Sequence, residues 1–212
     1  MAGKGSKATQ VIIPDIQIEL ATLGIVGTSP LIVHKFSEKA RKEILDKCMQ
    51  KAKSGKEPKN PVMEFMQSLH WLTPMPEIYT EEAFAAALAG GAKFGFPATG
   101  VKQSAVSAAY RAGLTKDKVS TYGAFHILGG ELIEIQGVPR MREDYAVINN
   151  GAPEIRYRAE FPEWEMYFDI KYNAAVFSLE QIVTFFNFGG FAVGVGDWRI
   201  EKGGVFGAYK VA

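Results

Sequence analysis

The sequence has few of the residues and runs that mark secreted, membrane-spanning or zinc-dependent proteins. Only one of its 212 residues is a cysteine, Cys48, so neither an internal disulfide nor an all-cysteine metal site can form. No apolar run approaches the roughly 20 residues that a membrane-spanning helix needs. Residues 1–10 are small and polar, so we expect a tail there and no signal peptide. These absences predict a cytoplasmic protein with no membrane partner.

Charge of neither sign is in excess. The chain has 24 Lys and Arg against 23 Asp and Glu, a formal net charge of +1, which says nothing by itself about partners. Residues 35–59 are locally basic, with nine Lys and Arg against four acids. A solvated helix face followed by a polar loop is the simpler explanation for most of these lysines.

Motifs of metal and nucleotide chemistry are also missing. HExxH, CxxC and EF-hand spacings do not occur, and the three histidines are scattered along the chain. His34, beside Lys35 at a strand end, is the one candidate for general acid–base chemistry, but the sequence identifies no partner carboxylate. We therefore expect no metal, no cofactor and no catalysis, with a role for His34 as the alternative.

Periodicity predicts an α+β protein. Alternation over residues 15–20 puts Ile16, Ile18 and Leu20 on one face of a strand. Ser37 can cap a helix, and Ser178 with Gln181 forms a capping box for a helix that Gly189-Gly190 would end. Residues 36–92 have the pattern of a helical insertion. Further elements are expected at 101–112 (helix) and at 132–135, 145–148, 164–172 and 205–211 (strands).

Without the insertions the element order is strand, helix, strand, strand, helix, strand. This order predicts a ferredoxin-like βαββαβ core, which is also the order of RNA-recognition modules. We expect a single domain over residues 1–212, with the helical insertion at 36–92 and a β-hairpin arm at 137–162.

Two arginine pairs lie in the predicted arm. Arg140 and Arg142, like Arg156 and Arg158, are two residues apart, so each pair points to one side of an extended chain. Arginine forks suit phosphate groups and aromatic rings suit bases. Pairing with nearby acids is the alternative; those acids are Glu143, Asp144, Glu154 and Glu160.

Two glycine-bearing segments add candidate binding residues. Residues 95–103 are a near miss for a phosphate loop, and we reject nucleotide hydrolysis because Val101 precedes Lys102 and Gln103 replaces the metal-binding hydroxyl. A helix N-terminus with Lys102 can still bind phosphate, although a turn that only starts a helix is equally consistent. The glycines of residues 189–207 allow the backbone to approach a ligand closely, and the segment also has an aromatic ring for stacking and positively charged side chains. A purely structural hairpin is the alternative. The residues concerned there are Trp198, Arg199 and Lys202.

Three segments together resemble the RAMP superfamily of CRISPR-associated proteins, in particular the subunits that form the RNA-binding backbone of effector complexes. Residues 28–31 are similar to the family's Pro-Leu turn after the first strand, and residues 96–102 to its helix-opening glycine motif. Residues 189–207 are similar to its glycine-rich loop. The resemblance covers about half the chain. Residues 161–164 and 191–199 also resemble phage and prophage proteins, so the best match is a phage-encoded relative in a bacterial host cell.

The resemblance implies a non-catalytic protein that binds single-stranded RNA or DNA and oligomerises along the strand, with insertions that contact the neighbouring copy. One alternative is a metal-independent RAMP endoribonuclease that uses His34 as base. Another is a phage structural or adaptor protein. The expected nucleic-acid contacts are Lys35, Lys102, Gln103, Arg140, Arg142, Arg156, Arg158, Trp198, Arg199 and Lys202.

Overall fold

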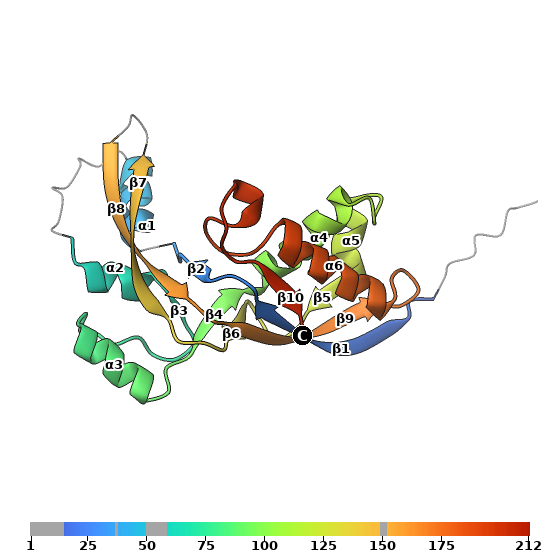
Figure 1. Cartoon of the computed structure of the whole chain (residues 1–212), viewed down its shortest axis with the longest axis horizontal. Coiled ribbons are helices and arrows are strands. Elements are labelled where there is room, and N and C mark those ends of the chain that lie inside the picture. The colour runs from blue at the N-terminus through green and yellow to red at the C-terminus, as the bar shows by residue number, and fades with distance from the viewer. Residues whose placement is uncertain (1–14, 37, 50–58, 149–151) are drawn as a thin grey trace, which may run out of the picture.

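The protein is an α+β structure built on antiparallel sheets (Figure 1). The computed structural model describes residues 15–36, 38–49, 59–148 and 152–212. The predicted tail at 1–10, the cap at Ser37 and most of the basic loop after residue 49 lie outside the described residues.

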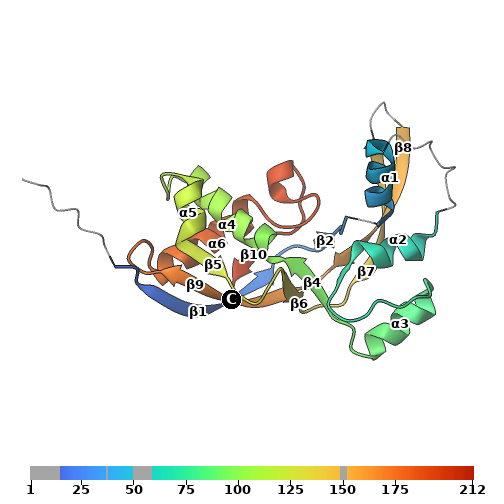
Figure 2. The ribbon, with the colours of Figure 1, turned by 180° about the vertical axis from the view of Figure 1, so that it is seen from behind.

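A four-stranded sheet has the order β10-β1-β9-β5, with all neighbours antiparallel. Its strands are β1 (Ile18–Gly27), β5 (Phe125–Ile127), β9 (Glu165–Asn173) and β10 (Tyr209–Val211). Three helices lie together on one face of this sheet (Figure 1 and Figure 2), and no helix of the described residues covers its other face. These helices are α4 (Ala98–Arg111), α5 (Lys118–Ala124) and α6 (Leu179–Ala192).

Alternation along β9 fixes which face is covered, as predicted. Met166, Phe168 and Ile170 are buried against the helices, because side chains of a strand alternate between faces. Side chains at the start of β1 also alternate between the two faces of the sheet. However, Ile18 and Leu20 are 54% and 70% exposed, on the face that the helices do not cover. The predicted apolar face of the first strand therefore does not enter the core.

A second sheet of three strands holds part of the insertion. It has the order β3-β4-β6, from β3 (His70–Trp71), β4 (Phe94–Pro97) and β6 (Leu132–Ile135). The strand predicted at 132–135 therefore exists but pairs with β4, and the short β5, which the sequence pattern did not predict, joins the larger sheet.

The predicted helical insertion contains α1 (Glu38–Cys48), α2 (Pro61–Ser68) and α3 (Glu81–Ala89). It is not a separate body, because Phe65, Met66 and Leu69 belong to the same cluster of buried side chains as Phe168 of β9.

The predicted arm is a long hairpin that stands away from the four-stranded sheet (Figure 2). Its strands β7 (Arg140–Ile148) and β8 (Ala152–Phe161) pair in register from Arg140–Glu160 to Ile148–Ala152. Strand β2 (Leu31–Val33) joins the base of β8 to complete the third sheet. The arm is thereby attached directly to the segment that leads into His34.

The capping box at Ser178 is confirmed, but the helix it starts does not end at Gly189-Gly190. Helix α6 continues to Ala192. Its glycines have no side chain to obstruct the close packing of the helix against β10. A Cβ at Gly190 would lie 1.9 Å from the carbonyl oxygen of Tyr209 in β10. The glycine-rich segment therefore begins with helix, then forms a loop and a short 3-10 helix (Ile200–Lys202) before β10.

Candidate functional site

A cleft of about 230 Å³ lies where α4, the loop after α6 and the end of β2 meet. The N-terminal half of α4 contributes Gly100 and Gln103, the loop contributes Asp197 and Arg199, and His34 follows β2. Three segments that the sequence singled out separately are therefore neighbours in space. The remaining polar side chains of the lining are His70, Ser104, Ser107 and Glu201.

His34 has a carboxylate partner that the sequence did not identify. Its Nδ1 lies 3.2 Å from Oδ2 of Asp197, which is 163 residues further along the chain. The backbone N–H of Asp197 donates to the carbonyl of Ile32 at 3.0 Å, which fixes the loop beside β2. Burial opposes ionisation of Asp197, but hydrogen bonds from His34 and Arg158 outweigh it and hold the pKa of this carboxyl below its usual value.

His70 is a second imidazole on the same cleft, whereas the sequence indicated only half-buried packing on a helix; it lies on strand β3. Burial and the nearby charge of Lys35 both lower the pKa of His70, which favours the neutral imidazole. A neutral imidazole both donates and accepts hydrogen bonds. Lys35 itself is exposed beside this edge, with its backbone N–H bonded to the carbonyl of Ser68.

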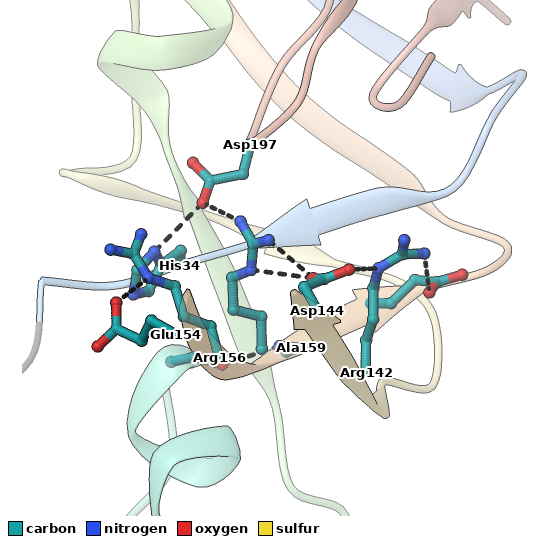
Figure 3. Close-up of polar contacts among 10 residues, drawn as sticks. His34, Arg142, Asp144, Glu154, Arg156, Ala159 and Asp197 are labelled. Carbon is teal, nitrogen blue, oxygen red and sulfur yellow. Dashed lines mark hydrogen bonds and ion pairs between the residues drawn. The ribbon is translucent and has the colours of Figure 1, made fainter. Parts of the chain in front are cut away.

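Each arginine pair of the arm points to one side of its strand, as the spacing predicted, and all four share one face of the hairpin because Arg142 and Arg158 are directly paired across it. Each is also bonded to an acid. Arg140 donates to Glu160. Arg142 donates to Glu160 and to Asp144, and Arg156 donates to Glu154 (Figure 3). These contacts are the alternative that the sequence left open.

The arginines of the arm differ strongly in exposure. The side chains of Arg140 and Arg156 are 65% and 38% exposed, whereas that of Arg158 is 3% exposed. Arg140 and Arg156 can therefore still present N–H groups to a ligand while they hold their acids. Arg158 cannot do so without movement of the arm.

Arg158 instead connects the arm to the cleft. It donates to Asp144 at 2.7 Å and to Oδ2 of Asp197 at 2.8 Å. Its guanidinium carbon lies 4.5 Å from the ring centroid of Trp198, within the range of a cation–π contact. Trp198 has φ +50°, a conformation that L-residues with large side chains seldom adopt.

The remaining predicted residues divide between the cleft and other places. Gln103 is exposed on the cleft, and Arg199 bonds Glu201, which also pairs with Arg111. Lys102 does not reach the cleft: its Nζ donates to the carbonyl of Tyr122 at 2.7 Å, and burial lowers its pKa. Lys202 is exposed on the 3-10 helix and does not line the cleft.

No family model matches the chain, and no curated protein matches it. Among the described residues, no group of three or more His, Cys, Asp and Glu side chains is placed to hold a metal ion. In the same part of the chain, every helix is too short or too polar to cross a membrane.

Proposed function

We propose that the protein binds single-stranded nucleic acid without cleaving it, with the sugar–phosphate backbone lying in the cleft between α4 and the loop at 193–201. The observation that carries this proposal is the convergence of Gln103, Arg199 and two imidazoles on one cleft, where Asp197 and Glu201 hold His34 and Arg199 in place. These groups are hydrogen-bond donors suited to phosphate oxygens. The N-terminal turn of α4 adds the positive end of a 14-residue helix.

The exposed arginines of the arm extend this surface in the proposal. Arg140 and Arg156 lie on the hairpin face from which Arg158 reaches the cleft, so a strand leaving the cleft would pass along them. Trp198, which is 39% exposed, offers a ring on which a base can stack. Lys35 is a further exposed cation, next in sequence to His34 of the cleft.

We also propose that the four-stranded sheet with α4 and α6 is a ferredoxin-like core, and that the chain is a phage-encoded relative of the RAMP backbone subunits. In a βαββαβ core the first and third strands are central, and the order β10-β1-β9-β5 has this arrangement. The three segments that carry the resemblance contribute to the cleft or lie beside it. Cytoplasmic localisation and assembly of many copies along one strand belong to the same proposal.

The test is a titration of labelled single-stranded RNA and DNA of equal sequence, at low salt and micromolar protein. We expect binding that weakens as salt is added, and the comparison identifies the preferred nucleic acid. Arg199→Gln should weaken binding roughly tenfold, as loss of a charged phosphate contact does. Lys171→Gln, an exposed lysine on the open face of the sheet, is the matched control and should bind as wild type. Absence of any shift with either nucleic acid contradicts the proposal.

A metal-independent endoribonuclease is the second candidate, favoured by one observation. His34 is held by Asp197 and shares the cleft with His70, which provides two imidazoles for general base and general acid. RNA incubated in EDTA should then be cut by wild type and not by the His34→Ala variant, while a matched DNA stays intact. A wild type that never cuts RNA removes this candidate.

A structural or adaptor role is the outcome if nucleic acid does not bind at all. Purified protein with a 260 to 280 nm absorbance ratio typical of free protein, together with no shift of either oligonucleotide, supports that role.

A further inference from the structure

Arg158 is a buried cation whose bonds join two different parts of the molecule. Its Nε and Nη2 both donate to Asp144 of the arm, at 3.1 and 2.7 Å, and its Nη1 donates to Asp197 of the loop. The side chain of Asp144 is 2% exposed, so both ends of the Arg158–Asp144 contact are removed from water. Such a pair is retained in a fold only with full hydrogen bonding, which the second carboxylate completes.

The loop that Arg158 holds is in a conformation that needs support. Trp198 has φ +50°, and backbone of this kind persists only where the surroundings fix it. Gly196, at φ +79°, lies so close to β2 that a Cβ would be 2.4 Å from the carbonyl oxygen of Ile32. The guanidinium of Arg158 covers the Trp198 ring from the side of the arm.

One carboxylate oxygen links the arm to the cleft. Oδ2 of Asp197 accepts from Arg158 at 2.8 Å and lies 3.2 Å from Nδ1 of His34 (Figure 3). A shift of the arm that moves Arg158 therefore changes the position of Asp197, and with it the partner of His34.

We propose that Arg158 is a positioning residue that fixes the loop at 194–199 to the arm, so that the cleft keeps its binding shape only while the arm is docked. In this arrangement a ligand or neighbouring copy that engages the arm acts on the cleft through Arg158 and Asp197. This inference rests on the proposed function for its consequence in binding, but the positioning itself is measured without nucleic acid.

The experiment is hydrogen exchange of the full chain, followed by mass spectrometry, on Arg158→Gln and Asp197→Asn. We expect the amides of residues 194–204 to exchange about tenfold faster in both variants, the factor given by loss of one charged hydrogen bond. Peptides of β1 and β9 should keep their wild-type rates. Arg156→Gln, two residues away on the same face but bonded to Glu154, is the control for a general loosening of the arm and should leave the loop unchanged.

The double variant distinguishes positioning from a general loss of stability. If Arg158 acts through Asp197, the double variant exchanges no faster in the loop than the faster single variant. If Arg158→Gln unfolds the arm, the loop exchange of Asp197→Asn decides whether Arg158 positions the loop, because that variant leaves the Arg158–Asp144 contact in place. Wild-type exchange of the loop in Asp197→Asn overturns the proposal.

Oligonucleotide titration of the same variants tests the consequence. A loosened loop with roughly tenfold weaker binding supports the coupling, and a loosened loop with wild-type affinity overturns it. If wild type binds no oligonucleotide, the proposed function fails while the exchange data still decide whether Arg158 positions the loop.

Discussion

The packing of α6 leads to a prediction in which two glycine-to-alanine changes in helices have opposite effects. Replacing a helical glycine by alanine ordinarily stabilises a protein, by about 0.5–1 kcal/mol. At Gly190 a Cβ would lie 1.9 Å from the carbonyl oxygen and 2.6 Å from the carbonyl carbon of Tyr209, both backbone atoms that cannot rotate away. Relief needs α6 to move away from β10, which separates buried Phe186 from its neighbours. Overpacking of a well-packed core costs about 1–3 kcal/mol.

We therefore expect Gly190→Ala to lower the free energy of unfolding by about 1 kcal/mol, after the helical gain is subtracted. Gly123→Ala is the matched control, because Gly123 is in α5 with nothing within 4 Å of the added Cβ. That change should be neutral or stabilising by a few tenths to about 1 kcal/mol. Urea unfolding followed by circular dichroism measures both. A Gly190→Ala protein as stable as Gly123→Ala would refute the close approach of α6 to β10.

Three further predictions concern the cap, the acids and the arm. Ser178→Ala removes the bond that the Ser178 hydroxyl accepts from the backbone N–H of Gln181, and this loss of the N-cap of α6 should cost about 1 kcal/mol in the same unfolding assay. Burial raises the pKa of Glu160, but hydrogen bonds from Arg140 and Arg142 outweigh it and hold the pKa below 4.5. Stability from Glu160 is therefore fully present above pH 4.5 and is lost as the pH falls through the lowered pKa, so Glu160→Gln should flatten the acid side of a plot of stability against pH. Deletion of residues 140–158 should abolish cooperative binding and filament formation, seen by light scattering and electron microscopy with single strands, while circular dichroism still reports a folded domain.

Local sequence signals predicted many of the helices and strands. They failed where contacts between segments far apart in the chain determine the structure. The Ser178 box and the alternation of β9 are contained within a few residues, so both could be predicted. The continuation of α6 through Gly189-Gly190 could not, because it depends on Tyr209 lying against the helix. Leu20 alternates correctly but is exposed, since periodicity shows that side chains share a face and does not show which face is covered.

For the site, the sequence identified the segments but not the partners of their side chains. Asp197 lies within the glycine-rich segment that was singled out, yet its contact with His34 spans 163 residues and depends on how the loop meets β2. The spacing predicted that each arginine pair points to one side, whereas the cross-strand register that sets Arg142 opposite Arg158 and Arg140 opposite Glu160 is a property of the folded hairpin. Lys102 was expected at a phosphate site because of its place at a helix start, but its side chain turns to Tyr122 and Phe125.

The internal pairing of the arm also bears on the source of affinity for a nucleic acid. Binding to single strands weakens with salt by a slope of about 0.7 for each phosphate that a protein neutralises. Four free arginines in the arm would contribute roughly 2.8 to that slope, on the same principle. Arg142 and Arg158 are mostly buried against Asp144, Glu160 and Asp197, so they contribute only if the strand displaces these acids. Arg140 and Arg156 are more exposed and can contribute in part while they stay paired. A shallow salt slope in the proposed titration therefore indicates that the arm stays closed and the cleft provides the contacts. A steep slope indicates that phosphates replace the carboxylates, and replacement at Arg158 would release Asp197 and the loop with it.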